Sequence, residues 1–413
     1  MKILQINNCH YRRGGADVVY LNTGNLLESF GNQVFYFSTK SEKNQKTRFE
    51  SFFVDGVDFI NMSLFKKMVN FLRFFYYSQS KKKLNDLIVK FRPDIAHIHL
   101  YKGGLTPSIL NALKNNKVPI VVSLHDYGFL DPHNLLLDGN LNISEKCING
   151  SVFNCFFDKS NRNSYLLSLV STLEYLFHKF FFPFDKCFDT IVAVSKFSQS
   201  KHLESNKFKW SIDHLYNFSP LLNQKEKVIN NQSNYLLYFG RLSKEKGIKT
   251  LIKAIKFLNK KIDLYVVGTG ELDLELKKYI SENNLLNVKL LGFKSGADLY
   301  KLIREAKFVV VPSEWYENNP MTIIEAYCFG VPVIGSRVGG IPEIIHEDKT
   351  GYTFNMGDVK DLSNILNKAL VLSESTYNEM KKSCRLFAKQ NFSPNSHYEK
   401  LMKLYQKTIN KTN

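Results

Sequence analysis

Short runs of β-branched and aromatic residues alternate with helical patterns along the whole chain, and this alternation most limits the folds it can adopt. In the second half the clearest runs are YLLYFG (235–240), DLYVVG (263–268), KFVVVPS (307–313) and VPVIGS (331–336). Runs such as FVVV suit strands that helices cover on both faces. Strands that alternate with helices form βαβ units, so the sequence predicts an α/β protein with parallel sheets.

The same rhythm occurs twice. A polar segment near 220–234 separates the two halves, and the 413 residues are enough for two domains of ordinary size. We therefore expect an N-terminal domain at 1–220 and a C-terminal domain at 221–392. A last helical pattern, 393–413, has no strand after it and is expected to pack across the domain junction.

The net charge of +18 is spread evenly: residues 1–220 carry 27 basic and 18 acidic side chains, and residues 221–413 carry 29 and 20. Such a surface attracts anionic lipid, phosphate-bearing ligands or nucleic acid. No RNA- or DNA-binding module is recognisable, so a nucleic-acid partner is not expected. The six scattered cysteines do not form a disulfide pattern, and no apolar run reaches the roughly 20 residues of a membrane span. These features predict a cytoplasmic protein.

The strongest candidate site begins after the strand YLLYF. The sequence GRLSKEKG places Arg241 and Lys246 on a loop between a strand end and a helix start. Ligands of parallel sheets bind outside the carboxyl ends of the strands, and two cations there can hold a diphosphate. The alternative is a solvated basic turn.

Two carboxylates follow the strand KFVVV. Glu317 lies in a loop and Glu325 lies eight residues later on the predicted helix. A loop carboxylate can accept hydrogen bonds from sugar hydroxyls, and a helical one from a ribose diol. The alternative is that this segment only caps the helix and that Glu325 is solvated.

The start of that helix is itself a candidate anion site. Asn319 is predicted as the N-cap, with Pro320 at the first helical position. The amides of Met321 and Thr322 would then point toward a bound anion.

In the first half, Gly14 and Gly15 lie between a strand and a helix. They could let the backbone approach a ligand or could only close a tight turn. The full G-x-G-x-x-G pattern is absent, which makes an NAD enzyme less favoured.

Histidines mark the neighbouring strand ends. His97 and His99 alternate on one strand and so share a face, and His125 ends the next strand beside Asp126. The first two could suggest a metal, but no close third ligand is present, so zinc is not expected. The chain also has no D-x-D triple, and Arg241 and Lys246 could take the place of a diphosphate-bound metal. No cofactor is therefore predicted.

Several of these motifs together resemble glycosyltransferase family 4. They are GRLSKEKGIKTLIKA, VVGTGE, LGF and the E-x7-E pair of Glu317 and Glu325 with EAYCFGVPVIGSRVGGIPEII, specific over about 235–350. More loosely, GGADVV, DIAHIHL, SLHDY and IVAVSKFS also match. The resemblance implies the GT-B fold, with two doubly wound Rossmann-like domains facing each other across a cleft, and a retaining transfer from a nucleotide-sugar.

The resemblance also assigns roles. Arg241 and Lys246 would hold the donor diphosphate, Glu317 would contact the transferred sugar, Glu325 would bind the ribose, and His125 would lie near the reaction centre. The remaining donor-side positions would be Gly15, Gly268, Phe293, Met321 and Thr322. The acceptor side would include Gly14, His99 and Asp126.

One departure concerns cysteines. Members from bacterial surface-polysaccharide pathways often carry a cysteine cluster after H-D-Y, whereas only Cys147 and Cys155 occur here. A metal-bound cluster is therefore not expected. The resemblance still favours capsule or lipopolysaccharide synthesis on a saccharide or lipid-linked acceptor.

No side chain stands out as a covalent nucleophile. The expected route is front-side attack, in which the leaving diphosphate takes the acceptor proton and the protein stabilises the departing charge. The alternatives are a GT-B epimerase or phosphorylase and a non-catalytic membrane adaptor that kept the fold.

Two segments depart from the strand–helix rhythm. The segment 64–92 has eight basic residues and one acidic among FLRFFYY, and the long excursion 126–187 contains FHKFFFPF. Basic and aromatic residues together favour an anionic membrane surface as a partner of the first domain. The alternative is that the aromatics form the core of an extra helix pair.

Overall fold

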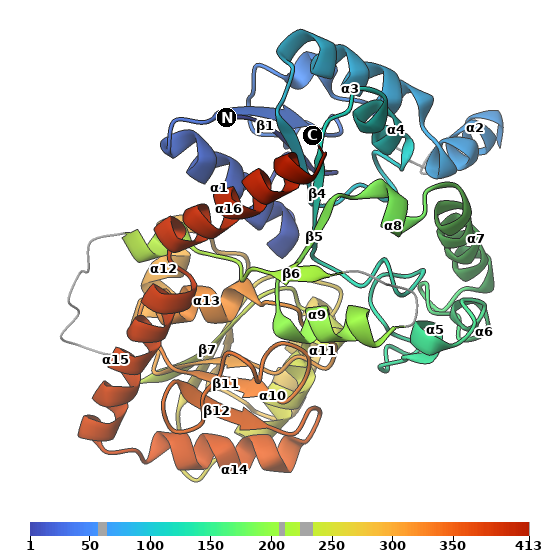
Figure 1. Cartoon of the computed structure of the whole chain (residues 1–413). Coiled ribbons are helices and arrows are strands. Elements are labelled where there is room, and N and C mark those ends of the chain that lie inside the picture. The colour runs from blue at the N-terminus through green and yellow to red at the C-terminus, as the bar shows by residue number, and fades with distance from the viewer. Residues whose placement is uncertain (57–63, 206–210, 224–233, 413) are drawn as a thin grey trace. The chain divides into compact units, whose positions relative to one another are not determined.

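The computed structural model describes residues 1–56, 64–205, 211–223 and 234–412. It forms two compact units (Figure 1). The first contains Met1–Asn140, Ser144–Tyr216 and His397–Asn413, and the second contains Asn217–Ser396 with Leu141–Ile143. Most of the polar segment in which the boundary was predicted, 224–233, lies outside the described residues.

The first unit has a six-stranded parallel sheet in the order β2-β1-β3-β4-β5-β6. Its strands are β1 (Lys2–Ile6), β2 (Gln33–Phe37), β3 (Ile95–Ile98), β4 (Ile120–Leu124), β5 (Thr190–Ala193) and β6 (Ile212–His214). Its helices are α1 (Gly15–Ser29), the 3-10 turn η1 (Glu50–Phe52), α2 (Leu64–Phe75), α3 (Ser78–Phe91), α4 (Ser108–Asn115), α5 (Lys146–Asn149), α6 (Asn154–Phe157), α7 (Tyr165–Phe181), α8 (Phe184–Cys187), α9 (Lys196–Glu204) and α16 (Pro394–Thr412).

The second unit has a six-stranded parallel sheet in the order β12-β11-β10-β7-β8-β9. Its strands are β7 (Tyr235–Phe239), β8 (Asp263–Val267), β9 (Val288–Leu290), β10 (Phe308–Val311), β11 (Val333–Ser336) and β12 (Gly351–Phe354). Its helices are the 3-10 turns η2 (Pro220–Asn223) and η3 (Lys244–Lys246), then α10 (Ile248–Ile255), α11 (Asp273–Glu282), α12 (Gly296–Glu305), α13 (Met321–Cys328), α14 (Val359–Leu370) and α15 (Glu374–Asn391).

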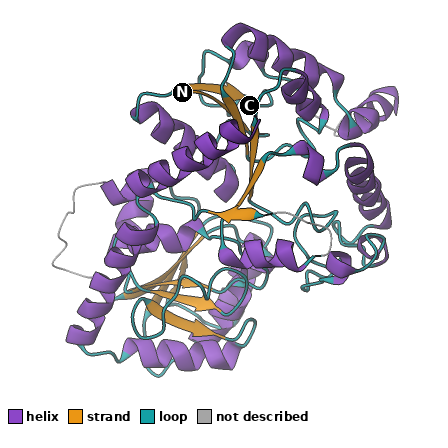
Figure 2. Cartoon of the chain, in the orientation of Figure 1, coloured by secondary structure: helices purple, strands orange, loops and turns teal. Residues whose placement is uncertain are grey.

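The strands form where the sequence is continuously apolar. Every residue of β4 and β10 is buried, as expected for strands that helices cover on both faces. Figure 2 shows the strands of each unit inside a surrounding layer of helices. The predicted parallel α/β architecture is therefore confirmed, and each unit is Rossmann-like.

Each sheet has a point where its strand order reverses. In the second unit the first strand, β7, lies between β8 and β10, so the chain runs outward on one side and then on the other. In the first unit the reversal lies between β1 and β3. Loops that leave adjacent strands in opposite directions open a crevice at the carboxyl ends of these strands, where ligands of α/β proteins bind.

The last helix packs on the first unit, although α15 before it belongs to the second. In α16 the Tyr398 ring stacks on Phe30 with centroids 3.9 Å apart, and the Thr408 hydroxyl hydrogen-bonds that of Thr190 over 2.7 Å. The first unit is therefore completed by a stretch of chain, from His397 on, that follows the second unit in the sequence.

Within the described ranges, which omit 57–63, 206–210, 224–233 and 413, no helix has both the length and the apolar character needed to cross a membrane.

Candidate functional site

A close contact between Gly268 and Gly240 shapes the loop after β7. Gly268 has φ +134°, and a Cβ there would lie 1.8 Å from the Gly240 carbonyl oxygen, so a side chain at 268 would displace the loop. The Leu242 amide donates to the Thr269 carbonyl over 3.0 Å, and the Gly240 amide to that of Val267 over 3.0 Å. Gly268, predicted to bind the donor, thus has a direct role in supporting the Arg241 loop.

Arg241 is held on that loop by a carboxylate. Its Nε donates to Ser243 Oγ over 3.1 Å and its NH2 donates to Glu245 Oε1 over 2.5 Å. Ser243 also donates to the same Glu245 oxygen, over 2.6 Å. The Arg241 side chain remains 64% exposed, so it is oriented and still accessible to a ligand.

Lys246 and Glu317 form an ion pair. Lys246 Nζ lies 2.6 Å from Glu317 Oε1, although 71 residues separate them. Lys246 follows β7 and Glu317 follows β10, so the adjacent strands on either side of the switch point supply the two charges. Lys246 also lies 4.7 Å from the centre of the Trp315 ring, a favourable cation–π contact.

Glu317 is buried, with 7% of its surface exposed, and is surrounded by donors. Ser313 Oγ and Trp315 Nε1 donate to Oε1 over 2.8 and 2.9 Å, in addition to Lys246. Burial by itself raises the pKa of Glu317, but Lys246 and these hydrogen bonds more than offset it and hold the pKa below its ordinary value. Glu317 is thus a fixed anion, and Oε2 takes part in none of these three contacts.

The backbone of Glu317 is held by a second glycine pair. The Gly340 amide donates to the Glu317 carbonyl over 2.7 Å. Gly339 has φ +59°, and a Cβ there would lie 2.4 Å from the Glu317 carbonyl oxygen. These glycines, in SRVGGIPE, were not predicted as site residues, although the GG pair was a signal for close backbone approach.

The helix after Glu317 starts one residue later than predicted. Pro320 is in the N-cap position and Met321 is the first residue of α13, so the assignment of Asn319 as N-cap is wrong. Asn319 instead accepts a hydrogen bond from the Asn217 amide over 2.9 Å. The first amides of α13, those of Met321 and Thr322, remain at the helix N-terminus, where they have no acceptor within the helix.

In the first unit, the loop after β1 is fixed by Asp17, which the sequence had not singled out. Asp17 is buried and accepts from Asn7 Nδ2 over 2.8 Å and from the Gly14 amide over 3.1 Å. Gly14 is the extended N-cap of α1 and Gly15 is the first residue of the helix, and both are exposed. A Cβ at Gly14 would meet only Asp17 Oδ2 at 3.8 Å, so its backbone does not require glycine.

The histidines after β3 and β4 form a hydrogen-bonded relay. His125 Nε2 lies 2.9 Å from His99 Nδ1, and His99 Nε2 lies 2.9 Å from Gln5 Oε1. Gln5 Nε2 donates to the Tyr405 hydroxyl over 3.3 Å, and Tyr405 lies 2.7 Å from His97 Nδ1. The rings of His97 and His99 stack with centroids 4.3 Å apart, as expected for two residues on one strand face.

The direction of the relay follows from Gln5, whose amide oxygen can only accept. His99 therefore carries its proton on Nε2 and accepts from His125 Nε2. Burial lowers the pKa of His125 to about 4 and that of His97 to about 3, and it lowers the pKa of His99 well below the ordinary value, so the rings are neutral. His125 thus has its proton on the ring nitrogen that faces His99.

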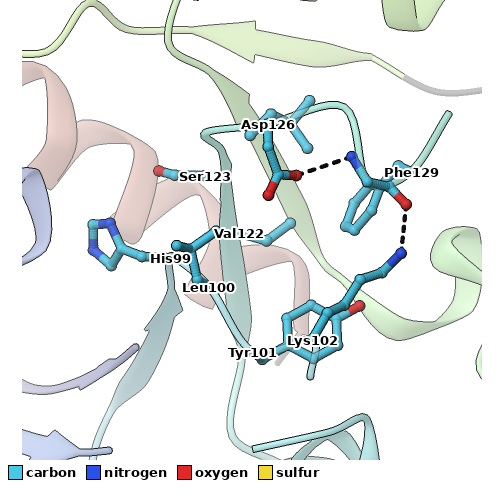
Figure 3. A pocket seen from close by; sticks show the side chains of 10 residues that line it. His99, Leu100, Tyr101, Lys102, Val122, Ser123, Asp126 and Phe129 are labelled. Carbon is cyan, nitrogen blue, oxygen red and sulfur yellow. Dashed lines mark hydrogen bonds between the residues drawn. The ribbon is translucent and has the colours of Figure 1, made fainter. Parts of the chain in front are cut away.

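A small pocket lies at the ends of β3 and β4. Figure 3 shows His99, Tyr101, Lys102, Ser123, Asp126 and Phe129 lining it. The Gly128 amide donates to Asp126 Oδ1 over 2.9 Å, and Lys102 Nζ donates to the Gly128 carbonyl. Burial raises the pKa of Asp126, an effect that Gly128 and Lys102 partly oppose. Lys102, which the sequence had not indicated, brings a cation to this edge.

Two domain families match the chain consecutively. "Glycosyltransferase Family 4" matches residues 13–218, and "Glycosyl transferases group 1" matches residues 222–387. This chain belongs to the family 4 glycosyltransferases.

Relatives of this glycosyltransferase include an uncharacterized 42.6 kDa protein in the cps region of Klebsiella pneumoniae, 24% identical over 88% of this chain and 92% of that protein. The Escherichia coli UDP-Gal:alpha-D-GlcNAc-diphosphoundecaprenol alpha-1,3-galactosyltransferase is 29% identical over 46% of this chain and 51% of that enzyme. This chain spans only 47%, 38% and 61% of the length of three other curated relatives that it matches.

The solved structure of Anabaena HepE in complex with UDP-glucose is similar to this glycosyltransferase. It superposes with a TM-score of 0.68 at 19% identity over 98% of this chain and all of that chain. At this identity the likeness shows the fold, which is GT-B.

The structure brings some of the predicted site residues into contact within each unit. Lys246 and Glu317 are in contact, and so are His99 and His125. Glu325 is half-buried on α13, and Phe293 is 71% exposed after β9. The predicted ligand roles of these residues, and the predicted cleft, stay predictions.

Three or more histidine, cysteine or carboxylate side chains that could share a metal ion are not found together in the part of the chain that the structure describes.

Proposed function

We propose that this chain transfers a sugar from a nucleotide-diphosphate-sugar to a saccharide acceptor, with retention at the anomeric carbon. The observation that carries the proposal is the Lys246–Glu317 pair at the switch point of the second unit. A lysine beside a fixed carboxylate offers a cation for a phosphate and an acceptor for a sugar hydroxyl at adjacent positions. A nucleotide-sugar requires both.

The chemistry depends on the leaving group. Breaking the bond from the anomeric carbon to the phosphate oxygen leaves negative charge on the diphosphate. Arg241, Lys246 and the first amides of α13 would stabilise that charge, because they are donors already fixed in position. The acceptor hydroxyl attacks from the side that the diphosphate leaves, and its proton passes to a diphosphate oxygen. The configuration of the sugar is then retained.

Glu317 is assigned to donor binding. The contacts that hold its pKa below its ordinary value also make it a poor proton carrier at neutral pH. Its oxygens would accept from hydroxyls of the transferred sugar, and Glu325 would bind the ribose. His125 keeps the sugar-contacting role that the family resemblance assigns.

The acceptor is proposed to be a lipid-linked saccharide of surface-polysaccharide synthesis. The support is the E. coli relative, whose name gives a diphosphoundecaprenol-linked acceptor, and the relative in the cps region. HepE supports a nucleotide-sugar donor, since its structure contains UDP-glucose. We place the reaction in the cytoplasm, at the inner face of the plasma membrane.

Metal independence is part of the proposal, because Arg241 and Lys246 supply the charges that a diphosphate needs. Turnover should persist in excess chelator. Loss of turnover, with recovery on adding magnesium or manganese, would contradict this account of diphosphate binding.

A donor screen tests the function. Purified protein is heated with each of a set of nucleotide-sugars, and the true donor should raise the melting temperature because it binds only the folded state. The selected donor is then incubated with a candidate acceptor, and the anomeric configuration of the product is determined by NMR. A product formed without acceptor would indicate an epimerase, and an inverted product would exclude retention.

A further inference from the structure

The helix α7 of the first unit has its polarity reversed. Its buried residues are Ser168, Ser171, Thr172, Glu174, Tyr175 and His178. The opposite side has an apolar residue every three or four positions, in the set Leu166, Leu169, Val170, Leu173, Leu176, Phe177, Phe180 and Phe181. A surface helix of a water-soluble domain normally has the opposite arrangement, with its apolar stripe on the core.

Hydrogen bonds hold α7 in this orientation. The Tyr175 hydroxyl donates to the Phe129 carbonyl over 2.8 Å, and the Asn161 amide donates to Ser168 Oγ over 2.9 Å. The His178 and Glu174 side chains lie 3.2 Å apart and are buried together. Rotating the apolar stripe inward would break these contacts and expose their partners, so the outward stripe is a fixed feature.

The outward stripe is strongly exposed. Leu166 is 70% exposed, Phe180 72% and Phe181 69%. Isolated exposed apolar residues are ordinary on a protein surface, whereas a continuous apolar stripe marks an interaction site. The stripe continues onto α2, which packs beside α7 (Figure 1).

A row of aromatic rings makes the two helices one surface. The ring centroids are 5.1 Å apart for Phe71 and Phe75, 5.8 Å for Phe75 and Phe177, and 4.9 Å for Phe177 and Phe181. Leu72, 66% exposed, lies beside Phe71. We call this surface, formed by Phe71, Leu72, Leu166, Leu173, Phe180 and Phe181, the α2–α7 face.

The charges around the α2–α7 face are basic. Arg73 and Lys179 are exposed on the two helices. The sequence of α2 contains no acidic residue, and the single acidic residue of α7, Glu174, is buried. Beyond the end of α7, exposed Asp185 and Lys186 balance each other. Pairing this face with a second copy of itself would bring like charges together, whereas an anionic surface complements them.

We propose that the α2–α7 face docks on an anionic lipid bilayer, with Phe180 and Phe181 inserted at the level of the headgroups. The proposal deepens the proposed function by naming the surface that approaches the membrane, and it depends on that function only for the lipid-linked acceptor. Aromatic side chains favour the interface, and basic residues are attracted to anionic headgroups. Through Tyr175, the inner side of α7 contacts Phe129, which lines the pocket of Figure 3.

Vesicle sedimentation tests the insertion. The full chain is mixed with vesicles of phosphatidylcholine, with and without phosphatidylglycerol. Binding should require phosphatidylglycerol and weaken with salt. Phe180→Ser with Phe181→Ser should lower the affinity about tenfold or more, since two large apolar side chains leave the interface. The matched control is Phe257→Ser with Leu286→Ser, which removes two exposed apolar residues, 59% and 88% exposed, from the second unit.

A second pair of variants tests the charge. Arg73→Gln and Lys179→Gln should each lower the affinity for phosphatidylglycerol vesicles about fivefold. Lys277→Gln and Lys389→Gln, two exposed lysines of the second unit, should have little effect. The salt dependence of binding should also become weaker in the first pair and not in the second.

Three outcomes would overturn the proposal. The first is wild-type affinity in the Phe180 and Phe181 variant, and the second is equal binding to neutral vesicles. The third is a dimer in sedimentation velocity that this variant dissociates while wild-type protein binds no vesicles. Docking and catalysis are separable, because a chain that binds vesicles but transfers no sugar would contradict only the proposed function.

Discussion

The two units place their candidate residues at the same topological position, but the groups at that position differ in charge. In the second unit the switch point holds ions: Arg241 with Glu245, and Lys246 with Glu317. In the first, the relay from His125 through His99 and Gln5 to Tyr405 is neutral, and the charged Asp17 and Lys102 lie on the loops after β1 and β3. The difference teaches that topology sets where a site forms and that the residues after each strand set its chemistry. Fixed cations suit a diphosphate, whereas neutral rings suit hydroxyl groups.

The largest predicted difference between the two units is in how their stability responds to acid. Nine of the ten histidines lie in the first unit, and burial is the main cause that lowers the pKa of each. The folded state keeps these rings neutral, so their contribution to stability is full above pH 6.5 or so and is lost as the pH falls toward about 4. Buried Asp126, Asp131 and Glu174 have raised pKa values and act in the opposite direction.

Glu245 and Glu317 of the second unit have lowered pKa values, so their contribution is lost only at a lower pH than their ordinary range. Hydrogen exchange read by mass spectrometry at pH 7 and pH 4.5 should therefore show the first unit opening while the second stays protected. Simultaneous opening of both units would remove this contrast.

Among the substitutions, Lys246→Met should have the largest effect on turnover and stability. It removes a cation assigned to the diphosphate and leaves Glu317 buried without its ionic partner, so both kcat and the melting temperature should fall. The loss in kcat is expected to be about 10²–10³-fold, and the loss in stability about 1–3 kcal/mol. Adding Glu317→Gln should restore most of the melting temperature and none of the turnover. Restored turnover would mean that Lys246 only neutralises Glu317 and does not bind the diphosphate.

Arg241→Ala tests the second cation of the charged site and allows it to be compared with Lys246. The loss in kcat should again be about 10²–10³-fold, because the guanidinium is oriented for the diphosphate. The melting temperature should also fall, but less than in Lys246→Met, because buried Glu245 loses its ionic partner and keeps the hydrogen bond from Ser243. The measurements are turnover at saturating donor and a melting curve. Near-normal turnover would exclude Arg241 from diphosphate binding.

Tyr405→Phe tests the neutral site and should have the smallest effect. It removes the hydroxyl that joins Gln5 to His97, which should cost about 1–3 kcal/mol of stability. If Tyr405 positions His125 through the relay, the acid limb of the pH–rate profile should also move. Tyr398→Phe on the same helix, which loses a hydrogen bond from Asn32, is the control and should leave the profile unchanged.

The sequence predicted the strands with long apolar runs, and it missed the two that lack them. β6 is IDH and β12 is GYTF, too short and too polar to show a pattern. Parallel pairing supplies what local sequence does not: β6 pairs with β5, and β12 with β11.

The sequence predicted which residues form the candidate site, but it did not predict which of them are in contact. Arg241, Glu317 and His125 follow from strand ends and family motifs, whereas the Lys246–Glu317 pair joins loops from two adjacent strands. Tyr405 lies 308 residues after His97, and nothing near either residue indicates their contact. The orientation of α7 was also hidden, because a helical pattern shows that one side is apolar and not which side the fold covers.

The place of Tyr405 has a consequence for how the protein is made. Because a chain leaves the ribosome from its N-terminus, the whole of Asn217–Ser396 emerges before Tyr405 does. The second unit can form its sheet while translation continues. Gln5 can form its hydrogen bond to Tyr405 only after the 400 residues that separate them have been synthesised. The unit that is synthesised first is therefore the one completed last, and nascent chains that end before residue 397 would expose the unfilled histidine relay to the quality-control machinery of the cell.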